Sequence, residues 1–404
     1  MINMKRYQII FTLSIIFFML SSGFAIYQVF LRGYISTVDL AVYRQAGYDL
    51  IHSIPLYTSE FGIRLNVRLG YVYPPIASVL FVPFALISMN LTKWIWTILS
   101  ILELIVVARI SFARFLRDRK TYKYSYLFLI TSMVIWVSPM YNNLIYGQID
   151  ILVLTLILVD LVYLNENSRP KWLPEGILIG VAAAIKLVPA LFFIYFLIIR
   201  DFKRLKNSVI TFAGFTLIGF LIIPSDSKSY WLHYLENTGK NDNAWYFTNQ
   251  SLDGMLRRFF PTNWFDIWVP LVVAMVIFGF ITAYNANKRH QYFLAVILIG
   301  TLGVIISPIS WIHECIWVIP IIGFILDDGK TFMRTAAAIG YYIFTTVELL
   351  QLGKHLIHHG FKIPGDILEN SLGLSLILIL FFLSKLSSFK NKTNTFKSVG
   401  TKAD

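Results

Sequence analysis

The sequence contains one cysteine, Cys315, among its 404 residues. An intramolecular disulfide is therefore excluded, and so is a cysteine-rich metal or iron–sulfur site. Charged residues are also few, at 14%, against 57% hydrophobic residues and a mean hydropathy of +0.65. Since a soluble domain cannot cover that much apolar surface, the composition indicates an all-α polytopic membrane protein.

Motifs of the common nucleotide-driven and hydrolytic proteins are also missing. No P-loop, GxGxxG, HExxH or GxSxG pattern is present, so NTP-driven transport and the usual hydrolase classes have no support. The longest polar stretch, at about 224–263, is too short to fold alone. No internal repeat of the kind found in many transporters is visible. We therefore expect a single integral-membrane domain over 1–388, followed by a basic, disordered tail over 389–404.

Twelve apolar segments are interpreted as membrane spans. They lie at about 8–31, 92–113, 124–141, 149–164, 174–186, 187–200, 207–223, 265–284, 291–306, 312–326, 332–350 and 366–386. The stretch 174–200 is divided because it contains Lys186 and Pro189, and a charge in mid-bilayer costs about 2.5–3.5 kcal/mol. Residues 75–89 are apolar but interrupted by Pro83, which favours a re-entrant or interfacial helix over a span.

The distribution of Lys and Arg supports this topology. With the N-terminus inside and 75–89 not crossing, 23 of the 35 Lys and Arg residues fall on the cytoplasmic side. Both termini of this multi-pass cell-membrane protein are then cytoplasmic, and two long external loops result, at about 32–91 and 224–264. The positive-inside rule explains the net charge of +13, so no nucleic-acid partner is predicted.

Under this topology, polar residues gather at the external ends of the spans. They are Asp39, Gln148, Asp150, Lys186, Asn249, Gln250, Arg257, Ser310 and His313. Chance would scatter such residues over both faces of the membrane. Their shared side therefore points to an extracytoplasmic site.

Asp39 has two compatible interpretations. Ser36-x-x-Asp39 fits a capping box at the start of a helix that runs to about His52. A carboxylate held at such a helix start can also take the proton from an acceptor hydroxyl as that hydroxyl attacks. About thirty residues later, Tyr73-Pro74-Pro75 ends one segment and sets the direction of the next.

Aromatic and amide side chains near Asp39 also have a structural and a functional interpretation. Tyr43 and Tyr73 either belong to an aromatic belt at the membrane surface or bind a sugar ring. Gln148 and Asp150 begin a span on the external side, where they either cap the helix or contact a ligand.

Cations at the external face are candidates for binding a phosphate. Taken singly, Lys186 and Arg257 are typical of snorkelling side chains, but together they can neutralise a phosphate whose lipid tail lies in the bilayer. His313 opens a span beside a serine, a tryptophan and Glu314, and it is an equal candidate for structure and for function. Three later histidines are interpreted as an exposed surface turn, because no nearby carboxylate could complete a metal site with them: His355, His358 and His359.

With these residues in view, the chain resembles the GT-C superfamily of integral-membrane glycosyltransferases. Within it, the resemblance is to the family 87 type, the polyprenyl-phosphate-mannose-dependent α-mannosyltransferases. It covers most of the chain and is carried by Val38 to Gly47, Pro55-Leu56-Tyr57, Tyr73-Pro74-Pro75, Gly147-Gln148, Ala184 to Pro189, Asn249-Gln250-Ser251-Leu252-x-Gly254 and Ser307-Pro308-x-Ser310-Trp311-x-His313. Two positions depart from the pattern. Asp150 stands where the family more often has Asn, and His52-Ser53-Ile54-Pro55 lacks the usual glycine.

The resemblance implies a GT-C-like bundle with helices at 39–52 and 75–89 lying along the membrane surface. It also implies that Asp39 is the general base, and that neither a nucleotide sugar nor a metal or other cofactor is required. We therefore predict inverting transfer of a hexose, with mannose as first choice, from a polyprenyl-phosphate sugar to a hydroxyl of a lipid-linked or envelope glycan. The expected partners are membrane lipids, this donor and the glycolipid or glycan acceptor.

The chemistry of the leaving group assigns the remaining roles. A departing lipid phosphate needs cations, whereas a glycosidase needs two carboxyl groups, one of them acidic. Lys186, Arg257 and His313 are the predicted phosphate ligands. The predicted sugar or acceptor contacts are Tyr43, Tyr73, Gln148, Asp150, Asn249, Gln250, Ser251 and Trp311. The alternative is a lipid-linked glycan flippase, polymerase or transporter, against which the charges at span ends rather than within spans argue.

Overall fold

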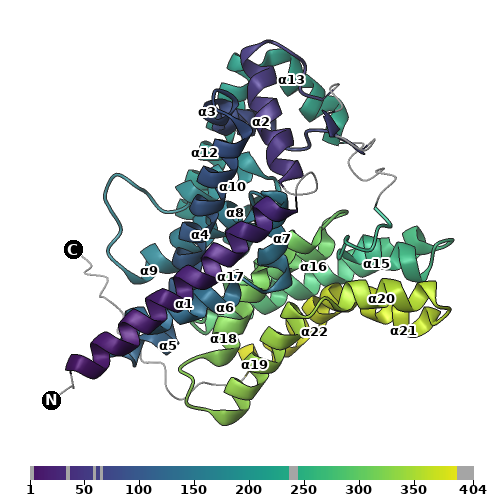
Figure 1. Cartoon of the computed structure of the whole chain (residues 1–404). Coiled ribbons are helices and arrows are strands. Elements are labelled where there is room, and N and C mark those ends of the chain that lie inside the picture. The colour runs from purple at the N-terminus through teal and green to yellow at the C-terminus, as the bar shows by residue number, and fades with distance from the viewer. Residues whose placement is uncertain (1–3, 33–36, 58–60, 64–66, 236–243, 389–404) are drawn as a thin grey trace.

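The computed structural model describes residues 4–32, 37–57, 61–63, 67–235 and 244–388. Helices make up almost all of this part of the chain (Figure 1), which confirms the predicted all-α class. Strands β1 (Phe61–Ile63) and β2 (Val67–Leu69) form a short antiparallel ladder in the first predicted external loop. Ser36 and the predicted tail over 389–404 lie outside the described residues.

The helical elements follow one another along the whole chain. Up to residue 198 they are α1 (Met4–Leu31), α2 (Val38–Ile51), η2 (Pro75–Phe81), α3 (Val82–Ala85), α4 (Met89–Ser111), α5 (Ala113–Arg117), η3 (Lys120–Tyr122), α6 (Lys123–Val134), α7 (Ser138–Tyr146), α8 (Asp150–Leu158), η4 (Val159–Tyr163), α9 (Leu164–Glu166), α10 (Ile177–Ile185), η5 (Val188–Ala190) and α11 (Leu191–Ile198). Beyond it they are α12 (Phe202–Ile222), α13 (Pro224–Ser229), η6 (Tyr230–Tyr234), α15 (Leu252–Phe259), α16 (Trp264–Lys288), α17 (Tyr292–Ile306), η8 (Ile312–Trp317), α18 (Val318–Leu326), α19 (Phe332–Thr346), α20 (Leu349–His358), α21 (Lys362–Glu369) and α22 (Ser371–Ser388).

Among the described residues, four helices are long and apolar enough to cross a membrane: α1, α4, α12 and α16. Two bent pairs raise the number to six if each pair is one span. In the first pair Lys120–Val134 meets α7 at 74°, and in the second α21 meets α22 at 62°. Several other predicted spans correspond to single helices that are shorter, such as Tyr292–Ile306 and Ile312–Leu326. The chain is a membrane protein, and the number of twelve spans stays a prediction.

The predicted break within 174–200 is present. α10 ends at Ile185, Lys186 has an extended backbone, and a short 3-10 turn containing Pro189 leads into α11. Proline cannot donate a backbone hydrogen bond, and its ring clashes with the carbonyl of the residue four positions earlier, here Ile185, which explains why α10 ends there. As a result, Lys186 lies between two helices rather than within a continuous span.

The first predicted external loop folds as two packed helical segments, α2 against η2 and α3 (Figure 1). A Cβ atom on Gly47 would lie 2.5 Å from the backbone carbon of Phe81, so only glycine allows this close crossing. Arg44 of α2 donates to the carbonyl oxygens of Phe84 and Ile87 at the end of α3, which fixes the two segments together. The predicted helices at 39–52 and 75–89 thus have nearly the expected limits.

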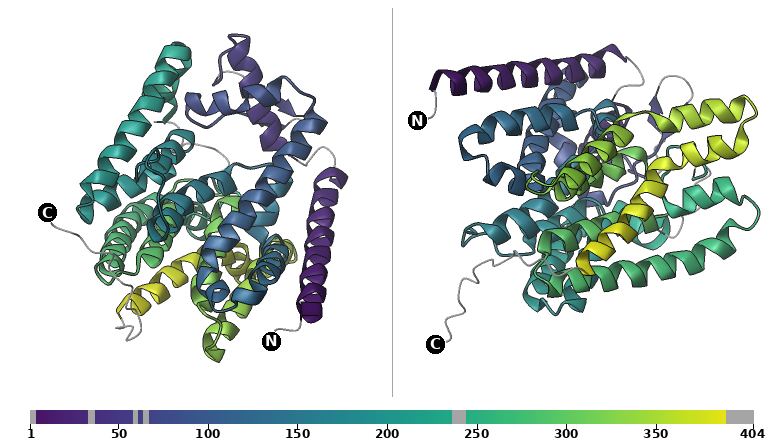
Figure 2. Two further views of the ribbon diagram at one scale, coloured as in Figure 1. Left: turned by 90° about the vertical axis from the view of Figure 1, so that its left-hand side faces the viewer. Right: turned by 90° about the horizontal axis from the view of Figure 1, so that it is seen from below.

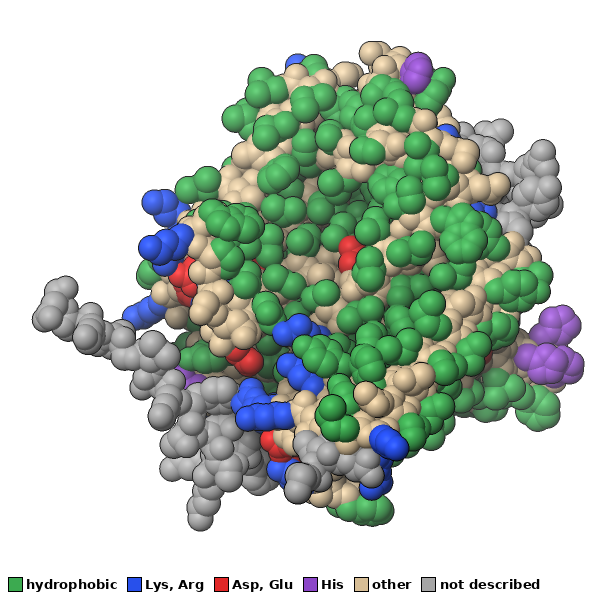
Figure 3. Space-filling model, turned by 60° about the vertical axis from the view of Figure 1, so that its left-hand side comes forward, with side chains coloured by type: hydrophobic (Ala, Val, Ile, Leu, Met, Phe, Trp, Pro, Cys, Tyr) green, Lys and Arg blue, Asp and Glu red, His purple; other side chains and the backbone are tan. Residues whose placement is uncertain are grey.

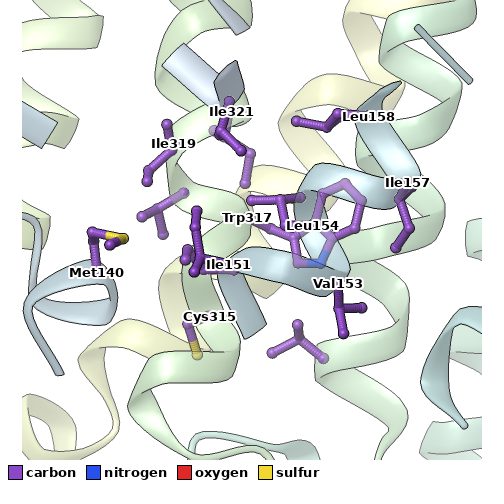
Figure 4. Close-up of a cluster of buried hydrophobic side chains, with 14 of the residues drawn as sticks. Met140, Ile151, Val153, Leu154, Ile157, Leu158, Cys315, Trp317, Ile319 and Ile321 are labelled. Carbon is purple, nitrogen blue, oxygen red and sulfur yellow. The ribbon is translucent and has the colours of Figure 1, made fainter. Parts of the chain in front are cut away.

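The interior of the bundle is a continuous apolar core. Figure 4 shows Leu154 and Ile157 of α8 near Trp317 of η8, with Ile319 and Ile321 of α18 in the same cluster. Two further views show how the helices pack around these central elements (Figure 2). Both α8 and η8 begin with polar residues and then enter the core. Their packing therefore brings the polar starts of the two helices to the same end of the bundle.

A helical hairpin formed by α20 and α21 lies next to α15 (Figure 1). Hydrogen bonds connect the ends of these elements. Arg258 of α15 donates to Asn370 Oδ1 through both Nε and Nη2, and Gln250 Nε2, just before α15, donates to the carbonyl of Glu369. The three histidines predicted to form a surface turn are exposed at the end of α20: His355, His358 and His359.

Candidate active site

Gly147 determines how Gln148 is placed beside Asp39. α7 ends at Gly147, whose left-handed backbone (φ 69°) costs glycine little. A Cβ atom on Gly147 would lie only 2.6 Å from Leu40 Cβ, so glycine also allows α2 to approach the end of α7. Gln148, which follows Gly147, is thereby brought next to Asp39, which precedes Leu40.

The side chain of Gln148 connects Asp39 to two tyrosines. Its Nε2 donates to Asp39 Oδ2 over 2.7 Å, and its Oε1 accepts from the hydroxyls of Tyr43 at 2.6 Å and Tyr73 at 3.3 Å. The two tyrosine hydroxyls are 2.9 Å apart. This network orients the carboxylate. Within the described residues, no hydrogen bond is made to Asp39 Oδ1, which leaves that oxygen available to a substrate.

The environment of Asp39 changes its acidity. The pKa of Asp39 is raised to about 7, and burial of the carboxyl group is the largest cause. The negative charge of Asp150 also raises this pKa, whereas the hydrogen bond from Gln148 and the positive charge of Lys186 lower it. A general base works best when its pKa is near the working pH, because it is then deprotonated yet still basic. The position of Asp39 suits that role.

A second polar group contains Lys186, Asp150, Glu314 and His313. Lys186 Nζ is 2.6 Å from Asp150 Oδ1 and 3.3 Å from Glu314 Oε1. Asp150 Oδ2 makes no hydrogen bond within the described part of the chain and lies 3.7 Å from His313 Nε2. The ammonium group of Lys186 is therefore paired with two carboxylates. One carboxylate oxygen, Asp150 Oδ2, has no hydrogen-bond donor among the described residues.

The two groups form one site, because Lys186 Nζ also lies 5.8 Å from the ring centre of Tyr73. We call the combined set the Asp39–Lys186 cluster; its members are Asp39, Tyr43, Tyr73, Gln148, Asp150, Lys186, His313 and Glu314. Beneath it, a cavity of about 40 Å³ is bounded by polar members of the cluster and by apolar residues of α8 and α17.

Glu314 is a member of the cluster that the sequence analysis noted only as a neighbour of His313. An acidic residue at the start of an apolar segment was the signal that could have identified it. The cluster holds three carboxylates against one ammonium group. No set of three or more His, Cys, Asp and Glu side chains in the described ranges is arranged to hold a metal ion.

Three of the predicted sugar contacts make hydrogen bonds within the protein, and their role as sugar contacts stays a prediction. The side chains of Asn249, Gln250 and Ser251 are fully buried. Asn249 Oδ1 accepts from the backbone of Ser310, Gln250 Oε1 accepts from the backbone of Gly373, and Ser251 Oγ caps the start of α15. These bonds fix the segment that leads to His313, so they serve to position the cluster.

Arg257 and Trp311 lie outside the central contacts of the cluster. Arg257 Nε donates to Asp253 Oδ2 over 2.8 Å, and its guanidinium group stacks 3.6 Å from the ring centre of Trp264. Both partners lie on α15 and at the start of α16. Trp311 is half-buried and pairs through its backbone with Asn249. Arg257 as a phosphate ligand and Trp311 as a sugar contact stay predictions.

The fold and the Asp39–Lys186 cluster define a helical membrane protein with a cluster of charged and polar side chains at one end of its bundle. Residues 71–308 match the family model described as glycosyltransferase family 87, and the chain belongs to this family. It is therefore a glycosyltransferase. No solved structure matches the chain significantly.

Curated relatives extend the match beyond the family model. A Mycobacterium tuberculosis protein, "Polyprenol-phosphate-mannose-dependent alpha-(1-2)-phosphatidylinositol mannoside mannosyltransferase", is 30% identical over 70% of this chain and 68% of its own length. A protein of the same description from Mycolicibacterium smegmatis is 29% identical over 78% of this chain and 76% of its own. A second M. tuberculosis protein, described as acting on phosphatidylinositol pentamannoside, is 27% identical over 77% and 71%.

Proposed function

We propose that this glycosyltransferase moves mannose from a polyprenyl-phosphate-mannose donor to a hydroxyl of a glycolipid or lipid-linked glycan. The observation that supports the proposal best is the carboxylate of Asp39. One of its oxygens is held by Gln148, the other is open to substrate, and its pKa is raised to about 7. The donor class follows from the relatives, each of which is named as dependent on polyprenol-phosphate mannose.

In the proposed reaction, Asp39 takes the proton of the acceptor hydroxyl. The hydroxyl oxygen forms a bond to the anomeric carbon while the bond from that carbon to the donor phosphate breaks. Attack opposite to the departing phosphate inverts the configuration of the sugar. The products are the elongated glycan, a polyprenyl phosphate monoester anion and a proton on Asp39.

The departing phosphate requires positive charge rather than a proton. Lys186 is the cation of the cluster nearest to Asp39 and is the proposed phosphate ligand, with His313 beside it. Since Asp150 and Glu314 already neutralise Lys186, the donor has to compete with these carboxylates for the ammonium group. We therefore expect Lys186 to exchange one carboxylate for a phosphate oxygen when the donor binds.

The lipid part of the donor needs an apolar surface next to the cluster. Figure 3 shows one face of the molecule with a hollow in its middle, surrounded by hydrophobic side chains and with an acidic side chain inside it. A polyprenyl chain on an apolar face of the bundle would remain in the bilayer while its phosphate reached the cluster. The concentration of Lys and Arg at the other ends of the helices supports an extracytoplasmic position for the site.

A transfer assay tests the proposal. The purified protein is reconstituted in liposomes with radiolabelled polyprenyl-phosphate mannose and a mannosylated phosphatidylinositol acceptor. Label should appear in the acceptor with release of polyprenyl phosphate, and it should continue to appear in the presence of EDTA. An intact donor that only changes leaflet would support a flippase instead. Loss of transfer in EDTA would indicate that the carboxylates of the cluster hold a metal ion.

A further inference from the structure

A second polar cavity lies at the opposite end of the bundle from Asp39. Its volume is about 700 Å³, within the range of about 300–1,000 Å³ typical of small-molecule sites. α8 begins in the cluster at Asp150, and Leu161, eleven residues further along the helix, lines the cavity. At about 1.5 Å per residue, the two sites are about 16 Å apart along the helix.

Three cations border this cavity, and they differ in how they are bound. Arg204 pairs with Asp201 and Glu175, and Lys203 pairs with Glu175. Arg204 Nε is buried without a hydrogen-bond partner among the described residues. Arg200 is exposed, and no ion pair to it is found in the described part of the chain. An anion in the cavity would therefore find one exposed guanidinium group, that of Arg200, which has no ion pair within the described ranges.

The backbone of Arg200 gives a second reason to assign it a role. Arg200 follows α11 with φ 60°, a left-handed conformation that glycine adopts at helix ends without steric cost. A side chain larger than glycine at such a position is strained by about 1 kcal/mol or more. An arginine here carries a conformational penalty that the charge of its side chain can offset when an anion is bound.

The remaining walls of the cavity match a lipid rather than a soluble anion. Phe196, Phe202 and Val296 provide apolar surface, and the hydroxyl of Tyr292 is 2.8 Å from His290 Nδ1. Phe202 begins α12, a helix long enough to span the membrane and mostly exposed on its sides. The cavity is thus at the end of a lipid-facing span, where phospholipid headgroups lie.

We infer that this cavity binds an anionic phospholipid, with its phosphate at Arg200 and its acyl chains along α12. Basic pockets between membrane helices are known to select anionic headgroups. Asp201 also lines the cavity, but Arg204 neutralises its carboxylate. The proposed topology places this end at the cytoplasmic leaflet; the binding chemistry itself does not depend on which leaflet that is.

Retention of lipid by the purified protein tests the inference. Native mass spectrometry would follow binding of dioleoyl phosphatidylglycerol, with dioleoyl phosphatidylcholine and glycerol phosphate as comparison ligands. Arg200→Gly removes the charge and also relieves the backbone, so it should fold at least as well as the wild type. A charged hydrogen bond contributes about 1.5–3 kcal/mol, and each 1.4 kcal/mol is tenfold in affinity, so we expect about a tenfold or larger loss.

Two controls separate this site from a general attraction between charges. Lys206→Gln removes one positive charge from the same helix, α12, but does not line the cavity, and it should bind phosphatidylglycerol like the wild type. Arg200→Lys should retain part of the binding. Equal binding of phosphatidylglycerol by wild type and Arg200→Gly would overturn the inference. Equal binding of glycerol phosphate would also overturn it, in favour of a free-phosphate site.

The outcome does not depend on the proposed transfer reaction. Lipid retention is measured without donor or acceptor, and Asp39→Asn should leave it unchanged because Asp39 lies at the other end of the bundle. Loss of transfer with normal lipid retention, or the reverse, would assign the failure to one of the two proposals.

Discussion

Replacing Asp39 with asparagine separates its proposed chemical role from a purely structural one. Asparagine keeps the size of the side chain and can still accept the hydrogen bond from Gln148, but it cannot take a proton. A general base contributes about 100-fold to 10,000-fold to a rate, so transfer by Asp39→Asn should fall by at least about 100-fold. The assay is release of polyprenyl phosphate from radiolabelled donor under saturating acceptor.

The same substitution should change stability in a direction that depends on pH. Because the pKa of Asp39 is raised from 3.8 to about 7, the folded protein keeps this proton when the unfolded chain has lost it. The resulting stabilisation is complete at low pH and is lost as pH rises through about 7. A shift of about three units corresponds to about 4 kcal/mol at most, and since Asp39 is only half-buried, we expect about 1–2 kcal/mol.

Thermal unfolding at pH 5 and pH 8 measures this difference. Relative to the wild type, Asp39→Asn should gain stability on going from pH 5 to pH 8, while its transfer activity stays near background at both. Asp49→Asn is the matched control, since Asp49 lies on the same helix, is buried, and also has a raised pKa, but is bonded to Gln45 rather than to the cluster. It should retain transfer activity.

Two results would refute this reasoning. Transfer near wild-type level in Asp39→Asn would remove Asp39 from the proton-transfer step. A stability difference between wild type and Asp39→Asn that stays constant between pH 5 and pH 8 would show that the carboxyl group titrates at an ordinary pKa. In wild type, transfer should rise with pH to a plateau, with half of the maximum near pH 7.

Further predictions concern the neighbours of Asp39. Gln148→Leu removes the hydrogen bond that lowers the pKa of Asp39, so the midpoint of the pH–activity curve should move up by about one unit. Lys186→Met leaves the carboxylates of Asp150 and Glu314 without their cation and should lower the free energy of unfolding by about 3–5 kcal/mol. Adding Glu314→Gln should restore part of the lost stability, as measured by thermal unfolding. Gln250→Ala removes three hydrogen bonds and should lower stability by about 2–4 kcal/mol with little change in the acceptor KM, whereas a sugar contact would raise that KM instead.

Several elements could be predicted because their signals are local in sequence. The Ser36-x-x-Asp39 pattern predicted a helix up to about His52, and α2 ends at Ile51, although its N-cap position is Thr37, whose side chain makes no capping hydrogen bond. Pro189 beside Lys186 predicted a break that separates α10 from α11. Proline geometry and helix caps act over a few residues, so neither needs knowledge of the rest of the fold.

The number of spans was harder to predict. Apolar length identifies segments that avoid water, but it does not distinguish one straight helix from two short ones joined at an angle. The segment predicted at 124–141 is divided into α6 and α7, and the one predicted at 366–386 begins in α21 and continues, after a bend of 62°, in α22. Such divisions depend on which side chains the neighbouring helices present, and that information is not local.

Among the candidate residues, the sequence suggested a shared side of the membrane but not the individual partners. The resemblance to a family pointed to Asp39, and its polar character at a span end was visible directly. The burial of Asn249, Gln250 and Ser251 was not visible, because an exposed polar loop and a buried hydrogen-bonded one have the same composition. The contribution of Glu314 was hidden for the same reason.

By itself, the sequence determined that this chain is a helical membrane protein, where its main helix breaks fall and which glycosyltransferase family it belongs to. It could do so because composition, proline positions and motif order are properties of the chain alone. Only the tertiary structure decided that Gln148 holds Asp39 across 109 residues and that Lys186 is shared between two carboxylates. The physical reason is that these contacts, and the burial that raises the pKa of Asp39, arise when distant helices pack together and exclude water from the groups between them.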